Sequence, residues 1–257
     1  MPEINVKGIK VNYVGSVELD PLRPTLVLIH GAGQSLTTWR FQTGPLDNAG
    51  WNYVAPDLPG RGGSGGEGLR SVEEYKDFLK DFTDALGLGE LVLVGHSMGG
   101  GIALNFVLDY PEKVKALVLV GSGARLRVAG ETLKVVKNNY PLFCEVSPSR
   151  VFAETSPEEL KLEFRKGLLA TPGEVCYYDL TACHGFDFME RLGEITAPSC
   201  VIGGSLDILA PVKYSEYLRN NIKNSELHIF EGSGHFVMQE KAVEFNAAFM
   251  DFLARNL

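Results

Sequence analysis

A serine in a glycine-rich pentapeptide is the residue of this chain best suited to nucleophilic chemistry. The sequence Gly95-His96-Ser97-Met98-Gly99 follows the apolar run Leu91–Val94 and precedes an apolar segment that extends to Tyr110. This pattern predicts a strand, a sharp turn at Ser97 and then a helix, an arrangement that exposes the serine hydroxyl at the edge of a sheet. The glycines on both sides allow the strand and the helix to approach each other closely. We therefore interpret Ser97 as a nucleophile.

A serine hydroxyl needs a general base to take its proton, and the base needs an acid to orient it. Among the five histidines, His235 is the best candidate for the base, because it follows the apolar strand Leu227–Phe230 and a glycine-rich loop. Asp207 likewise follows a strand, Cys200–Ile202, and it precedes a helix that begins at Pro211. We predict that Ser97, Asp207 and His235 form a catalytic triad.

Two other carboxylates also follow strands and compete with Asp207 for the role of the acid. Asp57 begins the run Asp57-Leu58-Pro59-Gly60-Arg61-Gly62, where we expect it to hold the loop together. Glu231 lies four residues before His235, a spacing that suits a contact within one loop better than an orienting contact. Asp207 therefore remains the predicted acid.

The remaining histidines receive other interpretations. His228 lies inside a strand and is predicted to be structural, and His30 ends a strand, where we expect it to support the following loop. The residues predicted to lie at the substrate pocket are His30, His96, His184 and Phe236.

Cleavage of an ester produces a negatively charged oxygen, which must meet hydrogen-bond donors. Met98 begins the helix after Ser97, so its backbone N–H is one candidate donor. The run His30-Gly31-Ala32-Gly33 follows the strand Leu26–Ile29, and its small residues allow the backbone to approach a substrate. We assign the N–H groups of Ala32 and Met98 to the oxyanion hole.

Strand-like and helix-like segments alternate along the chain, which predicts an α/β fold with a mostly parallel sheet. Ser71-Val72-Glu73-Glu74 is a capping box that opens a helix extending to about Leu86. A last helix is expected from Val237 to Leu253, with Val243, Phe245 and Phe249 on its buried face. The predicted strands are Ile4–Val6, Lys10–Val14, Leu26–Ile29, Trp51–Ala55, Leu91–Val94, Ala116–Val120, Cys200–Ile202 and Leu227–Phe230.

One interval breaks this alternation. No clear strand appears between residues 122 and 190, but Ser156-Pro157-Glu158-Glu159 opens a helix there and apolar residues are frequent. A structureless loop of that length inside one domain is improbable. We therefore predict a single domain with a core of residues 1–121 and 191–257 and a helical cap inserted at residues 122–190.

Composition excludes several classes of function. The 257 residues carry a formal net charge of −8, which disfavours nucleic acid and anionic membranes as partners. No leader or membrane-spanning run is evident, and the four scattered cysteines favour a cytoplasmic protein with reduced thiols. A zinc site formed by Cys176, Cys183 and His184 has no second cysteine pair to support it, so we predict no metal and no organic cofactor.

The motifs together resemble the α/β-hydrolase superfamily over nearly the whole chain. The matching segments are His30–Gly33, Asp57–Gly62, Gly95–Gly100, Gly204–Asp207 and Gly232–His235, in the order nucleophile, acid, base that this fold uses. The resemblance implies an eight-stranded, mostly parallel sheet flanked by helices, with a helical cap after strand six. One departure is Gly60-Arg61-Gly62, where the family often has Gly-His-Gly, and we expect Arg61 at the mouth of the pocket.

These features predict a serine hydrolase that cleaves carboxylic esters of small to medium, hydrophobic substrates through an acyl-enzyme. Because a fold does not determine its reaction, two alternatives stay open. One is a carbon–carbon bond hydrolase or lactonase of a catabolic pathway. The other, of a different class, is a small-molecule binding protein with a vestigial triad. The sequence does not indicate the oligomeric state.

Overall fold

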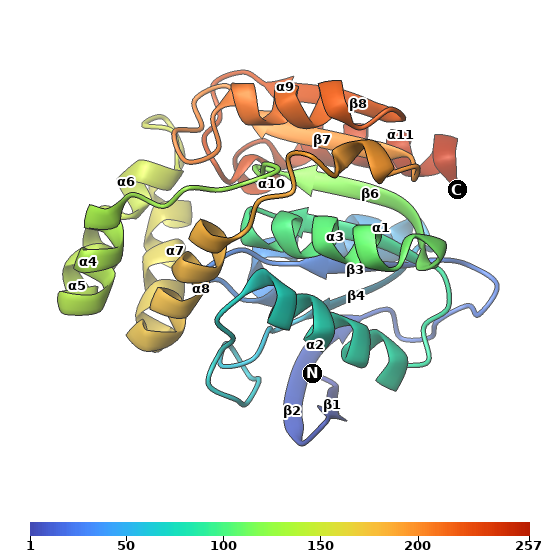
Figure 1. Cartoon of the computed structure of the whole chain (residues 1–257), viewed down its shortest axis with the longest axis horizontal. Coiled ribbons are helices and arrows are strands. Elements are labelled where there is room, and N and C mark those ends of the chain that lie inside the picture. Colours follow the sequence, from blue (N-terminus) through green and yellow to red (C-terminus); the bar gives the residue numbers. More distant parts are fainter.

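An eight-stranded sheet forms the centre of the computed structural model, which describes all 257 residues. Its strands lie in the order β1-β2-β4-β3-β5-β6-β7-β8 (Figure 1). β2 is antiparallel to both of its neighbours, β1 and β4, and all later pairs are parallel. The strands are β1 Glu3–Val6, β2 Ile9–Gly15, β3 Thr25–Ile29, β4 Asn52–Pro56, β5 Leu91–His96, β6 Val114–Val120, β7 Ser199–Gly204 and β8 Ser225–Phe230. The predicted mostly parallel sheet is confirmed.

Alternate residues of the central strands face opposite layers of helices. In β3, Val27 and Ile29 belong to the core on one side of the sheet, which also contains residues of α2, α3 and α9. Leu26 and Leu28 belong to the core on the other side, with residues of α1 and α11. Both sets are fully buried, which is why the strands read as continuous apolar runs in the sequence.

Helices cover both faces of this sheet, and most begin where the sequence predicts. Ser71 caps α2, because its side chain accepts a hydrogen bond from the N–H of Glu74. Helix α1 was not predicted, since its residues include Gly44 and Pro45, which are poor helix formers. The helices of the core are α1 Arg40–Asn48, α2 Val72–Ala85, α3 Met98–Asp109, α9 Val212–Asn221, α10 Val237–Glu240 and α11 Ala242–Asn256.

The predicted last helix is two helices, because the backbone leaves the helical conformation at Lys241. The side chain of Glu240 accepts hydrogen bonds from the N–H groups of Gly234 and Phe236, so the first segment is tied to the preceding loop. The prediction that Val243 is buried is wrong, since it is 80% exposed.

The chain between β6 and β7 contains five α-helices, one short 3-10 helix at Leu192–Glu194 and no strand. The α-helices form the part that precedes residue 190. They are α4 Gly130–Asn138, α5 Tyr140–Val146, α6 Pro148–Val151, α7 Glu158–Ala170 and α8 Gly173–Gly185. Figure 1 shows them gathered at one end of the sheet, the end to which β6 points. We refer to residues 122–190 as the cap segment, and its helices lie beside the loops that carry the predicted triad.

Candidate active site

Ser97 occupies the sharp turn between β5 and α3. Its φ of 54° and ψ of −115° lie outside the usual regions for a residue with a side chain, so the turn is strained. The Ser97 N–H donates to the carbonyl of Val120 (2.9 Å), and the Ser97 carbonyl accepts from the Ser122 hydroxyl (2.8 Å). These contacts with β6 and the segment after it hold the strained backbone in place.

The two glycines of the pentapeptide are needed because backbone passes where a side chain would stand. A Cβ added to Gly95 would lie 2.3 Å from the carbonyl oxygen of Gly99. A Cβ added to Gly99 would lie 2.2 Å from the carbonyl oxygen of Ile29. The close approach of β5, α3 and β3 therefore depends on the absence of these side chains.

We expect Gly99→Ala to lower the free energy of unfolding by about 1–3 kcal/mol, because α3 must move away from β3. Gly44→Ala in α1 is the matched control, since no atom lies within 4 Å of its added Cβ. The control is expected to change stability by less than about 1 kcal/mol. Urea denaturation of both variants makes the comparison, and equal stabilities would show that the close packing is not limiting.

Asp207 and His235 are joined directly. Oδ2 of Asp207 lies 2.7 Å from Nδ1 of His235, and both side chains are almost completely buried. Oδ1 accepts the N–H groups of Leu209 (2.8 Å) and Ala210 (2.9 Å). Burial by itself would raise the pKa of Asp207, but His235 and these hydrogen bonds lower it below its usual value. The carboxylate is therefore ionised, so it holds the proton of the ring on Nδ1 and leaves Nε2 as the basic nitrogen.

Ser97 and His235 line the same cavity, which has a volume of about 280 Å³. No hydrogen bond joins the serine hydroxyl to the ring in this structure; such contacts often tighten only when a substrate binds. The cavity lies between the core and the cap segment, and most of its lining is hydrophobic. The lining includes Leu126, Val128, Phe143, Val146, Phe164, Leu180, Ile208, Leu209 and Phe236.

The two rival acids do not contact His235. Asp57 is buried and accepts hydrogen bonds from the N–H groups of Leu36 (2.8 Å) and Gly63 (2.9 Å), so it holds its loop together. Glu231 is exposed at the beginning of the loop that leads to His235. Only Asp207 is within hydrogen-bonding distance of the His235 ring.

Two of the four predicted pocket residues, His96 and Phe236, line the cavity, whereas His30 and His184 do not. The pocket prediction was therefore wrong for His30 and His184. His184 lies on the outer surface of α8, and its Nδ1 is 3.0 Å from the carbonyl of Val128. The sequence placed His184 in a segment that lines the cavity, but it did not indicate which side of α8 the side chain faces.

His30 lies beneath the loop that follows β3 and supports it. Its Nε2 accepts the N–H of Leu58 (3.0 Å), so Nδ1 carries the proton and donates to the carbonyl of Gly31 (2.9 Å). That carbonyl and the N–H of Ala32 belong to one peptide unit, whose two polar groups point in opposite directions. His30 therefore fixes the direction of the Ala32 N–H, which makes no hydrogen bond within the protein.

The loop that carries Ala32 lies directly against the nucleophile. β3 pairs with β5 so that Ile29 is opposite Gly95, which brings the two loops together at the edge of the sheet. A Cβ added to Gly31 would lie 3.2 Å from Cβ of Ser97. Met98 is the first residue of α3, so its N–H has no acceptor inside the helix. Both amides assigned to the oxyanion hole are thus adjacent to Ser97 and free of helical partners.

His96 is fully buried beneath His235. Its ring centroid is 4.7 Å from that of His235, and its Nε2 is 3.1 Å from the His235 carbonyl oxygen. Burial and the neighbouring His235 lower the pKa of His96 well below its usual value, so the ring is neutral and Nε2–H is the donor. Nδ1 has no hydrogen-bond partner. His96 thus supports the backbone of His235 without taking part in its contact with Asp207.

We expect acidification to destabilise the fold through His30 and His96. Burial and the charge of Arg61 lower the pKa of His30 to about 3, from 6.5 in the unfolded chain. Between these values the unfolded state binds more protons, so the free energy of unfolding falls by about 1.4 kcal/mol per pH unit for each such ring. The stability from the neutral His30 ring is fully present above pH 6.5 and decreases as the pH falls toward 3, and that from His96 also decreases as the pH falls below 6.5.

Urea denaturation at pH 7, 6 and 5 measures this slope. His30→Asn removes one titrating ring and is expected to reduce the slope between pH 6 and pH 5 by about 1.2 to 1.4 kcal/mol per pH unit, whatever its effect on stability at pH 7. An identical slope in wild type and His30→Asn would contradict the assignment.

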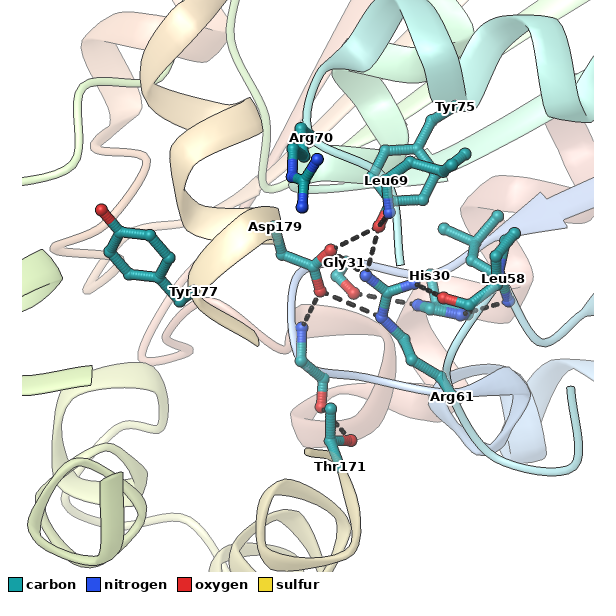
Figure 2. Close-up of polar contacts among 12 residues, drawn as sticks. His30, Gly31, Leu58, Arg61, Leu69, Arg70, Tyr75, Thr171, Tyr177 and Asp179 are labelled. Carbon is teal, nitrogen blue, oxygen red and sulfur yellow. Dashed lines mark hydrogen bonds and ion pairs between the residues drawn. The ribbon is translucent and has the colours of Figure 1, made fainter. Parts of the chain in front are cut away.

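Arg61 lies away from the mouth of the cavity, so the sequence-based expectation was wrong. Its side chain is fully buried and forms an ion pair with Asp179 of α8 (Figure 2). Arg61 replaces the histidine that the family often has in this loop. Here the longer side chain extends under the cap segment to a carboxylate that no local sequence pattern indicated.

The candidate metal ligands do not form an open site. Cys176 and Cys183 are buried in α8, His184 is exposed, and the three are not grouped within coordination distance. Ligand atoms of Cys200, Glu226 and His228 do lie within 4.8 Å of one another. Arg255, however, contacts Glu226 at 2.8 Å, so a guanidinium already neutralises this carboxylate.

No helix of the structure has the length and apolar character required to cross a bilayer.

Comparison with known proteins gives consistent relationships. A family model described as the alpha/beta hydrolase fold matches residues 24–163. A 2-hydroxy-6-oxononadienedioate/2-hydroxy-6-oxononatrienedioate hydrolase of Burkholderia vietnamiensis is 34% identical over 90% of this chain and 87% of its own length. A 2-hydroxy-6-oxo-6-phenylhexa-2,4-dienoate hydrolase of Burkholderia cepacia is 30% identical over 98% of this chain and 94% of its own.

Solved structures extend the comparison. A thermophilic esterase is 36% identical with a TM-score of 0.86, covering 99% of this chain and 97% of its own. An enol-lactonase from Burkholderia xenovorans has a TM-score of 0.92 at 20% identity, covering 98% and 100% of the two chains, and shows the same fold. This chain therefore belongs to the α/β-hydrolase fold family, and it is a hydrolase.

Proposed function

We propose that this hydrolase cleaves carboxylic esters of small to medium, hydrophobic acids through an acyl-enzyme on Ser97. The observation that carries the proposal is the 2.7 Å contact between Asp207 and His235 at the wall of a cavity that Ser97 also lines. An ionised carboxylate on Nδ1 makes Nε2 the proton acceptor, which is the arrangement that a serine nucleophile requires.

In the proposed reaction, Ser97 Oγ attacks the ester carbonyl while His235 Nε2 takes the hydroxyl proton. The carbonyl oxygen becomes negative and accepts hydrogen bonds from the N–H groups of Ala32 and Met98. His235 then gives its proton to the leaving alcohol, and the carbon–oxygen bond to that alcohol breaks. Water, deprotonated by His235, attacks the acyl-enzyme and releases the acid and the free serine.

The lining of the cavity favours an uncharged, apolar substrate. Arg127 and Arg150 are the only arginines of the lining, which contains no lysine, aspartate or glutamate. Arg127 is paired with Asp187 at 3.0 Å and also donates to the carbonyl of His184. The buried Arg61 is neutralised by Asp179. A dianionic substrate would therefore lose its hydration without meeting a buried countercharge, which is unfavourable.

A second candidate is hydrolysis of a carbon–carbon bond in a vinylogous diketone, or of a lactone. The relatives from Burkholderia are named as hydrolases of 2-hydroxy-6-oxononadienedioate/2-hydroxy-6-oxononatrienedioate and of 2-hydroxy-6-oxo-6-phenylhexa-2,4-dienoate, and these names support the candidate. Arg150 also supports it, because this lining residue is exposed and forms no ion pair. A substrate with one carboxylate can place that group at Arg150 and its apolar part in the cavity.

The partner and location that we propose follow from charge and thiol chemistry. We propose a small-molecule ester as the partner, and neither nucleic acid nor membrane, because the net charge is −8. All four cysteines are free and buried, and burial raises the pKa of Cys176 and of Cys183 to about 12. Free thiols suit the reducing cytoplasm, which we propose as the location.

A substrate panel with active-site labelling tests the proposal. A fluorophosphonate is expected to label wild type once per chain and to leave Ser97→Ala unlabelled. Multiple turnover is expected on p-nitrophenyl esters of short and medium acids, with lower kcat/KM on lactones and on a 2-hydroxy-6-oxo-dienoate. Preference for the dienoate or a lactone would favour the second candidate. Labelling without turnover of any substrate would overturn both and favour a binding protein.

A further inference from the structure

Asp179 is a fully buried carboxylate on cap helix α8 that contacts three segments of the core. Its Oδ2 accepts the backbone N–H of Gly33 (2.8 Å) and Nε of Arg61 (3.0 Å). Its Oδ1 accepts the hydroxyl of Tyr75 (2.7 Å) and is also paired with Nη2 of Arg61. Figure 2 shows Asp179 pointing from its helix into this group of donors.

The surrounding groups leave no polar atom of this cluster without a partner. Arg61 also donates to the carbonyl of Pro59 (3.0 Å) and to the hydroxyl of Tyr75 (2.6 Å). A buried ion pair is tolerated when its remaining donors and acceptors are satisfied, and it then fixes geometry more than it adds stability. The cluster therefore supplies orientation, and the group that it orients on the catalytic side is the amide of Gly33.

Gly33 follows Ala32, the residue assigned to the oxyanion hole. The peptide unit before Ala32 is held from the core, because His30 donates to the Gly31 carbonyl (2.9 Å). The peptide unit after Ala32 is held from the cap segment, because Asp179 accepts the Gly33 N–H (2.8 Å). Gly33 has a φ of +66°, and a Cβ there would lie 2.8 Å from the side chain of Leu168 in the cap segment, so the loop fits closely beneath α7 and α8.

We propose that Asp179 is a positioning residue for the oxyanion hole, so that the hole is complete only while α8 is seated on the core. The proposal rests on the proposed function, in which the Ala32 N–H stabilises the oxyanion. Two planar peptide units on either side of one Cα determine φ and ψ of that residue. Without the Asp179 contact, only the peptide unit before Ala32 is still held in place. The Ala32 N–H is then no longer fixed in the direction of the oxygen that becomes negative.

The test compares two double variants that differ in whether residue 179 still offers an acceptor to the Gly33 N–H and to the Tyr75 hydroxyl. Arg61→Met with Asp179→Leu replaces the buried ion pair by apolar side chains, a change that proteins often tolerate, and leaves the Gly33 N–H without an acceptor. Arg61→Met with Asp179→Asn also removes both charges but keeps a carbonyl oxygen that can accept that N–H. If Asp179 contributes only to stability, the two double variants are expected to have the same kcat once folded.

The readout is the inhibition constant of a methyl ketone divided by that of the matching trifluoromethyl ketone. Ser97 Oγ adds to the activated carbonyl, its proton passes to His235, and the carbonyl oxygen becomes an anion in the hole. The methyl ketone binds without forming this anion to a comparable extent. The ratio therefore reports stabilisation of the oxyanion, separately from binding of the part that the two inhibitors share.

We expect the ratio and kcat to fall by about 10- to 100-fold in the leucine double variant, with KM changed much less. The asparagine double variant is expected to recover most of that loss. If the wild-type enzyme prefers the trifluoromethyl ketone but the two double variants have equal ratios, the positioning role of Asp179 is overturned. A wild-type enzyme that does not prefer the trifluoromethyl ketone overturns the oxyanion assignment, and with it the proposed function.

If the leucine double variant does not fold, hydrogen exchange of the Gly33 amide in the wild-type protein decides the question. If the Asp179 contact holds the loop in place, the Gly33 amide must exchange its hydrogen about as slowly as the amides of β3. Exchange as fast as that of exposed loop amides overturns the proposal.

Discussion

Ser97→Ala is expected to lower kcat for the preferred substrate by a factor on the order of 10⁶, while the fold remains intact. The variant retains the cavity and both oxyanion donors but has no atom to form the acyl-enzyme. Alanine has the same backbone restrictions as serine at a φ of 54°, so the strained turn between β5 and α3 is unchanged. Steady-state kinetics on the substrate panel measure the effect, and near-wild-type turnover would contradict the nucleophile assignment.

Ser97→Gly provides a control that separates activity from stability. Glycine adopts a positive φ without the steric cost of a Cβ, so the variant is expected to be inactive and more stable by about 1 kcal/mol. Thermal denaturation of wild type and both variants makes the comparison. A stability unchanged by the glycine would show that the turn at Ser97 stores little strain.

Asp207→Asn is expected to lower kcat by a factor of about 10⁴. An asparagine amide can present its NH₂ group to Nδ1 of His235, and the ring proton then moves to Nε2. Protonated at Nε2, the neutral ring cannot accept the proton of Ser97. The expected loss is in kcat, with KM little changed, because Asp207 is buried behind the histidine and does not line the cavity.

Asp57→Asn is the matched control, since Asp57 is also a buried carboxylate that follows a parallel strand. It accepts the N–H groups of Leu36 and Gly63 and lies outside the contacts of His235. The variant is expected to lower the free energy of unfolding and to reduce kcat of the folded enzyme by less than about tenfold. A large loss of kcat in Asp57→Asn, with activity retained in Asp207→Asn, would reverse the assignment of the acid.

The strands and their direction could be predicted because their signal is local. Leu26–Ile29 and Leu91–Val94 are apolar on both faces, as strands covered by two layers of helices must be, and the structure buries all of them. Parallel strands need a long crossover connection, usually a helix, so the alternation of strands and helices predicts a parallel sheet whose strands have their carboxyl ends at one edge. Ser97, Asp207 and His235 each stand just beyond such an end.

The course of individual helices was less predictable from local patterns. Helix α1 was missed because Gly44 and Pro45 have low helix propensity, which packing of Leu46 into the core overrides. The break at Lys241 was missed because neither glycine nor proline marks it and apolar residues stand on both sides of the polar run Gln239-Glu240-Lys241. The break depends on Glu240, whose carboxylate binds the N–H groups of Gly234 and Phe236.

By itself the sequence determined the type of sheet, the residues that follow its strands and the requirement for glycine around Ser97. These properties depend on neighbours close along the chain, such as the residues of a continuous apolar run or of a tight turn. The partners across the molecule were decided only by tertiary structure. Asp179 meets Arg61 and Gly33 because α8 packs on the core in one orientation, and His30 turns beneath its loop because the N–H of Leu58 meets its ring there. The contacts of Asp179 join residues more than a hundred positions apart and that of His30 joins residues 28 positions apart, so no local pattern contains them.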